Sequence, residues 1–147
     1  MTPHLQNTTV VACHWTEQRA VSNLFGYAGT ADLLIEHKVH GLCLVDLKTQ
    51  KCLRTATGKQ AKPKPYSTWC YQLAAYRAAL GVRATSINLI VNSVTPEMPV
   101  EHVWTEAEME SGLRAFMAAR ELWNIENDYN PAQTVVNVTA DTMVLTA

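Results

Sequence analysis

Two apolar runs joined by a short turn constrain the fold of this chain more than any other feature. The runs cover residues 26–37 and 41–49, and His40-Gly41 forms the turn between them. Apolar runs bounded by turn residues predict strands, and a short connection makes the two strands antiparallel neighbours. Each run carries an aspartate, Asp32 in the first and Asp46 in the second. An ionised carboxylate among apolar residues is costly without a metal or a partner, so both aspartates need an explanation.

The alternation of side chains along a strand decides what these two carboxylates share. It places Asp32 on one face of the first strand, and Asp46 with Lys48 on one face of the second. If the two faces coincide, two carboxylates and a lysine converge. Gly29 weakens the first strand by propensity, so its presence indicates close approach by another backbone or by a ligand.

Further strands and a loop are predicted around this pair. The short runs at residues 8–12 and 17–22 precede it and complete an antiparallel meander. Residues 51–65 contain two prolines and one glycine, which predicts a loop. Apolar patterns predict two more strands at residues 87–92 and 100–104.

Two helices are predicted in the second half of the chain. The first covers residues 68–80, with Ser67 as its cap and Gly81 as its left-handed end. The second begins at a capping box formed by Thr105 and Glu108. Its apolar stripe is expected to pack on the sheet as core. The stripe comprises Met109, Leu113, Phe116, Met117 and Trp123.

Length and composition fit one soluble domain spanning residues 1–147. No apolar run approaches the roughly 18 residues that cross a bilayer, which argues against a membrane partner. The first residues lack a positive region followed by an apolar stretch, so we expect a cytoplasmic protein, in the host cell if the source is viral. The tail at residues 131–147 is Val-rich and suits an added strand, a subunit contact or a disordered end.

The cysteines are widely separated and contain no Cys-x-x-Cys pair, which disfavours a zinc ribbon or a redox motif. We expect reduced structural thiols. The set is Cys13, Cys43, Cys52 and Cys70.

Cations are concentrated after the second aspartate. Residues 48–64 hold half of the Lys and Arg residues and no acid. A solvated loop is the ordinary explanation of such a run. Because the run directly follows the Asp46-x-Lys48 strand, it could instead draw in a phosphate backbone. The predicted DNA-binding residues are Lys51, Arg54, Lys59, Lys62 and Lys64.

The two aspartates suit a divalent metal. Hard cations such as Mg²⁺ prefer carboxylate and carbonyl oxygens, which Asp32, Asp46 and the backbone carbonyl of Leu47 can supply. Lys48 projects to the same face, where it can orient or deprotonate the nucleophilic water and offset developing charge. Asp-x-Lys alone occurs by chance, and an exposed ion pair is its simpler explanation.

Three motifs in a fixed order make the pattern more specific. They are Gly29-Thr30-Ala31-Asp32, Val45-Asp46-Leu47-Lys48-Thr49 and Gln72-Leu73-Ala74-Ala75-Tyr76. This set resembles the RecB-like branch of the PD-(D/E)XK nuclease superfamily, which includes phage enzymes of the lambda-exonuclease type. The resemblance covers about residues 17–81.

That resemblance implies an α/β restriction-endonuclease-like core, with a central mixed sheet flanked by helices. This chain departs from many members, which place a helix before the first strand, so we expect a core that is minimal at the N-terminus or completed by a partner. It implies Mg²⁺ as cofactor, with Mn²⁺ as a substitute. Gln72 would reach toward the metal-bound water or Lys48, and Tyr76 would contact a substrate phosphate or brace the site. Glu17 would be a further metal ligand or an ordinary surface residue. The cysteines lack the arrangement of one early and three clustered late residues that holds an iron-sulfur cluster in some relatives, so none is expected.

The predicted function is a Mg²⁺-dependent DNA exonuclease of recombination, repair or phage DNA processing. Two alternatives remain open. One is a catalytically silent nuclease-fold module that binds DNA, and the other is a structure- or site-specific endonuclease. A homo-oligomer is also compatible, because processive relatives can be rings.

Overall fold

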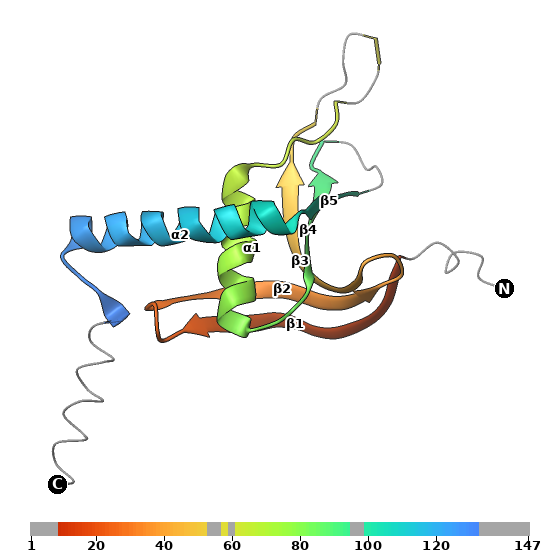
Figure 1. Cartoon of the computed structure of the whole chain (residues 1–147). Helices are drawn as coiled ribbons and strands as arrows, with labels where there is room; N and C mark the ends of the chain where they lie inside the picture. Colours follow the sequence, from red (N-terminus) through yellow and green to blue (C-terminus); the bar gives the residue numbers. More distant parts are fainter. Residues whose placement is uncertain (1–8, 53–56, 59–60, 95–98, 133–147) are drawn as a thin grey trace, which may run out of the picture.

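A mixed sheet and two helices make up the described part of the chain, residues 9–52, 57–58, 61–94 and 99–132 of the computed structural model. The sheet order is β1-β2-β3-β4-β5, and β3 with β4 is its parallel pair. The crossover between these two strands contains helix α1, as parallel neighbours require. The elements, shown in Figure 1, are β1 Val10–Ser22, β2 Tyr27–His37, β3 Gly41–Gln50, α1 Ser67–Leu80, β4 Thr85–Asn92, β5 Val100–Trp104 and α2 Glu106–Asn127.

The first three strands form the predicted antiparallel meander. The prediction of separate strands at residues 8–12 and 17–22 is wrong, because β1 is one strand over Val10–Ser22. Its middle residues pair with β2 like its ends, so tertiary pairing joins two runs that look separate in the sequence. Residue 8 lies outside the described residues, as do residues 133–147 of the Val-rich tail.

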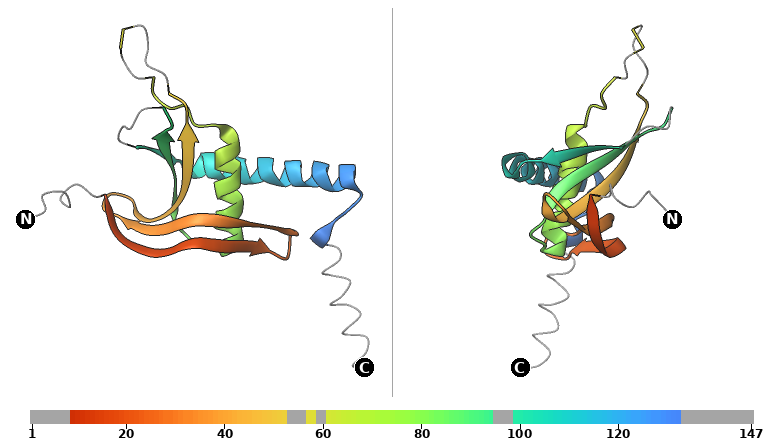
Figure 2. Two further views of the ribbon diagram at one scale, coloured as in Figure 1. Left: turned by 180° about the vertical axis from the view of Figure 1, so that it is seen from behind. Right: turned by 90° about the vertical axis from the view of Figure 1, so that its right-hand side faces the viewer.

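Strands β2 and β3 separate at a defined point. Their ladder starts at the turn and ends at the pair Leu33–Val45. Beyond it, β2 continues beside β1 while β3 continues beside β4. Figure 1 shows the result, with β1 and β2 running across the lower part of the molecule and β3 and β4 rising away from them; Figure 2 shows the same divergence from two other sides. We call this point the strand fork, and Asp32 and Asp46 are the first residues beyond the last pair.

Helix α1 ends as predicted but begins differently. Gly81 takes the left-handed conformation (φ 63°) that ends the helix. At the other end, the predicted Ser67 cap is wrong, because Ser67 is already helical and the cap position belongs to Tyr66. The Tyr66 side chain makes no capping hydrogen bond, and its carbonyl accepts from the Trp69 N–H.

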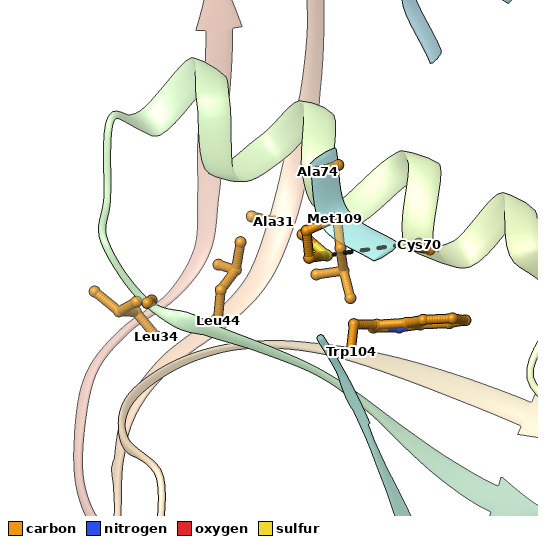
Figure 3. Close-up of a cluster of buried hydrophobic side chains, with 9 residues drawn as sticks. Ala31, Leu34, Leu44, Cys70, Ala74, Trp104 and Met109 are labelled. Carbon is orange, nitrogen blue, oxygen red and sulfur yellow. Dashed lines mark hydrogen bonds between the residues drawn. The ribbon is translucent and has the colours of Figure 1, made fainter. Parts of the chain in front are cut away.

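The main core lies between the sheet and the two helices. Figure 3 shows sheet residues facing α1 and the start of α2. The labelled members are Ala31, Leu34, Leu44, Cys70, Ala74, Trp104 and Met109. A second cluster of buried residues on the opposite face of the sheet, Ile35, Cys43, Val45 and Ile87, contains strand residues only.

Helix α2 packs on α1 more than on the sheet, so the prediction for its apolar stripe is only partly right. Met109 is buried in the main core. A Cβ on Gly112 would lie 3.0 Å from the Cys70 Sγ of α1. Farther along, Phe116 packs edge-on against Tyr27 of β2, and the Trp123 side chain is 49% exposed. The predicted capping box at its start, Thr105 with Glu108, is confirmed.

All cysteines are free thiols, as predicted. Cys43, Cys52 and Cys70 are buried, and Cys13 is exposed. Burial raises the pKa of the Cys43 and Cys70 thiols to about 11, so both remain protonated at neutral pH and behave as small apolar groups. Neither helix of the described residues is long and apolar enough to cross a membrane.

Candidate metal centre at the strand fork

The strand fork brings Asp32 and Asp46 together. The two residues would form the next antiparallel pair after Leu33–Val45, so their side chains share a face. The Asp32 Oδ2 accepts a hydrogen bond of 2.7 Å from the backbone N–H of Leu47. In a strand, the N–H and C=O of one residue point to the same side, so the Leu47 carbonyl also points toward the fork. The three predicted ligand groups therefore meet at one place.

Asp46 is a buried carboxylate, with 3% of its surface exposed. The Lys48 Nζ lies 2.9 Å from its Oδ2 and 3.1 Å from its Oδ1. Burial raises the pKa of the Asp46 carboxyl, and the negative charge of Asp32 raises it further. The hydrogen bond and the positive charge of Lys48 act in the opposite direction and lower this pKa. A divalent cation between the two carboxylates would remove much of the cost of ionising Asp46.

A chain of hydrogen bonds connects the lysine to α1. The Lys48 Nζ donates to the Gln72 Oε1 at 2.7 Å, and the Gln72 Nε2 donates to the Tyr76 hydroxyl at 2.9 Å. Of the two partners expected for Gln72, the structure shows Lys48. Because Gln72 and Tyr76 are four residues apart, they lie on one side of the helix.

The close approach predicted at Gly29 is present, and the group that approaches it is the side chain of Tyr76. A Cβ at this position would lie 2.5 Å from the Tyr76 Cε1. Only glycine therefore leaves room for the tyrosine ring as placed. The Tyr76 ring is therefore held between Gly29 and the Gln72 amide, which donates to its hydroxyl.

Glu17 does not begin a strand, contrary to the predicted run at residues 17–22. It lies within β1, is exposed, and has a φ of 52°, which is rare for a residue other than glycine. The register places it opposite Asp32, between the pairs Thr16–Leu33 and Gln18–Ala31. Within the described ranges, the structure contains no group of three or more His, Cys, Asp or Glu side chains suited to a metal. Glu17 therefore does not join Asp32 and Asp46 as a third carboxylate ligand in this structure.

The predicted basic loop starts where β3 ends. Lys51, Lys62 and Lys64 are exposed, and the other two predicted DNA-binding residues, Arg54 and Lys59, lie outside the described residues. The Gln50 side chain forms two hydrogen bonds with the backbone of Lys64, at 2.7 and 2.8 Å. This clamp ties Lys64 to the end of the strand that carries Asp46 and Lys48.

Sequence reasoning missed Asn88 of β4, which is fully buried and adjoins Asp46 in the parallel register. Its Nδ2 donates to the Asp46 Oδ2 at 2.7 Å, and its Oδ1 accepts from the Trp104 Nε1 at 2.6 Å. The available signal was an asparagine inside the apolar run at residues 87–91, since a buried amide requires partners.

The donor set suits a hard divalent cation. Two carboxylates and a backbone carbonyl provide oxygen ligands only, which is the preference of Mg²⁺ and Mn²⁺ and a poor match for zinc. The nearby ammonium group of Lys48 adds a proton donor and a positive charge. Together these groups can bind a metal and act on a phosphate ester. No protein-family model matches this chain, and no curated protein matches it.

Proposed function

We propose that this protein is a Mg²⁺-dependent deoxyribonuclease that hydrolyses phosphodiester bonds of DNA as an exonuclease, with Mn²⁺ as a substitute cation. The observation that carries the proposal is the meeting of Asp32, Asp46 and the Leu47 peptide at the strand fork. Lys48 lies beside them, held by Gln72. The mixed sheet with helices packed on it supports a minimal restriction-endonuclease-like core.

In this proposal the carboxylates of Asp32 and Asp46 and the carbonyl of Leu47 would hold the cation. The bound cation supplies Lewis acidity toward the phosphate and makes water more acidic. Lys48 orients the attacking water and offsets the charge that develops on the phosphate oxygens. Its 2.7 Å hydrogen bond to Gln72 limits the freedom of its long side chain. As water adds to phosphorus, the bond to the leaving ester oxygen breaks.

The basic loop would contact the DNA backbone next to this centre. Lys51 and Lys64 are separated in sequence, but the Gln50 clamp brings the second limb of the loop back to the end of β3. Exposed lysines bind phosphates without reading sequence, which suits an exonuclease.

Incubation of the protein with linear duplex DNA and Mg²⁺ tests the proposal, with Asp46→Ala as the inactive variant. Glu106→Ala is a matched control, because Glu106 is also a carboxylate paired with a cation, Arg77, but lies on α2. We expect cleavage by the wild-type protein and by Glu106→Ala, and none by Asp46→Ala. Equal degradation by Asp46→Ala would contradict the proposal.

Closed circular DNA separates the exonuclease from an endonuclease. An enzyme that requires an end leaves the circle intact, whereas nicking or linearisation would assign an endonuclease. Binding of DNA without cleavage in either Mg²⁺ or Mn²⁺ would instead assign a silent DNA-binding module.

A further inference from the structure

The pairing of β3 with β4 places the side chain of Asn88 beside Asp46. The two residues are Cα partners in the parallel β3–β4 ladder, so their side chains emerge on the same face. Asn88 is fully buried, and its Nδ2 contacts one carboxylate oxygen, Oδ2, at 2.7 Å. By contrast, Lys48 contacts both carboxylate oxygens. Asn88 therefore distinguishes the two oxygens of Asp46, and Lys48 does not.

Trp104 determines which end of the Asn88 amide faces the carboxylate. The indole Nε1–H is a donor only, so its 2.6 Å hydrogen bond requires the Oδ1 of Asn88 as acceptor. The Nδ2 then points to Asp46. Trp104 is buried in the main core, so the indole itself is held in place by packing.

We propose that Asn88, oriented by Trp104, is a positioning residue that holds the Asp46 carboxylate in its metal-binding rotamer. This inference rests on the proposed function. The Asn88 N–H occupies Oδ2, so Oδ1, whose contact is the longer 3.1 Å hydrogen bond from Lys48, would be the oxygen available to a cation. Lys48 cannot do this alone, because its ammonium group approaches both oxygens of Asp46. Asn88 contacts one of them, projects from a central strand and has short hydrogen bonds on both sides.

Binding of Mn²⁺ measured by calorimetry tests this without requiring catalysis. Asn88→Leu keeps the size of the side chain but removes the donor to Asp46, and we expect a roughly 10- to 100-fold weaker Mn²⁺ affinity. Trp104→Phe keeps an aromatic ring but releases the amide, and we expect a smaller loss. Ser86→Ala is the matched control, because Ser86 is equally buried on the same face of β4, and its Oγ has no hydrogen-bond partner among the described residues. It should bind Mn²⁺ as the wild-type protein does.

The double variant Asn88→Leu/Trp104→Phe separates positioning from structural damage. Asn88→Leu alone leaves the Trp104 N–H without its acceptor, which can prevent folding. The double variant removes both groups and should be more stable than Asn88→Leu. If Trp104 acts through Asn88, the double variant binds Mn²⁺ no more weakly than Asn88→Leu.

Three outcomes decide the matter. Wild-type-like Mn²⁺ affinity in Asn88→Leu or in the double variant would overturn the positioning role while leaving the proposed function intact. A wild-type protein that binds Mn²⁺ but leaves DNA uncut would overturn the proposed function, and the affinities of the variants would still decide the role of Asn88. A wild-type protein that does not bind Mn²⁺ would overturn both.

Discussion

Carboxylates at the strand fork and at the start of α2 are in opposite electrostatic conditions. At the fork, burial raises the pKa of Asp46 despite its contacts with Lys48 and Asn88. At the start of α2, hydrogen bonds from Arg77 lower the pKa of Glu106, and those from Thr105 lower the pKa of Glu108. Glu106 and Glu108 are exposed, whereas Asp46 is buried.

The difference indicates what each group does. Ionised Glu108 completes a capping box, and ionised Glu106 binds the Arg77 guanidinium through two hydrogen bonds of 2.7 and 2.9 Å. Both therefore support the fold in their charged forms. Ionised Asp46 is disfavoured by its burial and by the neighbouring charge of Asp32. Costly carboxylates of this kind cluster at functional sites.

The largest expected effect concerns the basic side chains paired with these carboxylates, Lys48 at the strand fork and Arg77 beside the start of α2. Lys48→Met should reduce the rate of DNA cleavage by about 100-fold or more, because it removes the group that orients water and offsets charge. Arg77→Met removes the cation paired with Glu106 and should leave the rate nearly unchanged. Single-turnover cleavage rates at saturating Mg²⁺ measure both. Equal losses of cleavage rate in the two variants would show that the strand fork matters no more for cleavage than the start of α2.

The second effect concerns the salt dependence of DNA binding. Lys62→Ala/Lys64→Ala removes two exposed cations from the basic loop and should reduce the slope of log affinity against log salt by about 2. Arg83→Ala/Arg114→Ala removes two exposed cations elsewhere and should not change the slope. Fluorescence anisotropy in Ca²⁺, across a salt series, provides the measurement. An unchanged slope in the lysine variant would make the loop ordinary solvated surface.

The third effect is a pair of opposite pH trends in stability. The raised pKa of Asp46 means that its contribution is present below the unfolded pKa, about 3.9, and is lost as pH rises through the folded value. Asp46→Asn should therefore gain stability relative to wild type as pH rises from about 4 toward neutral. The lowered pKa of Glu108 has the reverse sign, so its contribution is lost as pH falls.

Glu108→Gln should accordingly lose stability relative to wild type as pH rises toward the ordinary glutamate pKa of about 4.3, and the difference should stay constant at higher pH. Urea unfolding without divalent cations, repeated from about pH 3 to pH 7, gives both trends, that of Glu108 in the acidic part and that of Asp46 above it. Parallel trends in the two variants would show that the fork and the start of α2 do not differ in this way.

The smallest expected effect compares two helix starts. Thr105→Ala removes the side-chain acceptor of the capping box and should lower the free energy of unfolding by about 1 kcal/mol. Ser67→Ala removes no capping bond and should change it by less than about 0.5 kcal/mol. Urea unfolding at neutral pH measures both. A larger loss in Ser67→Ala would restore Ser67 as the cap of α1.

Much of the local structure could be predicted because it depends on residues close in sequence. The turn at Gly41, the alternation along β2 and β3, and the capping box of α2 are all local patterns. The prediction for the cap of α1 is wrong because the sequence around Ser67 does not reveal whether this serine is the last extended residue or the first helical one. The α2 stripe was assigned to the sheet because an apolar stripe predicts burial without identifying the partner.

The sequence by itself determined that Asp46 and Lys48 share a face of one strand, since side chains alternate along a strand, and that a short turn joins this strand to the strand of Asp32. The register of the pair then put Asp32 on the same face. Only the tertiary structure decided that β2 and β3 part at those residues, and that Asn88 and Trp104 lie beside Asp46. The reason is that β4 pairs with β3 through a crossover that contains α1. The register of such a parallel pair depends on how the helix packs on the sheet, which no local pattern encodes.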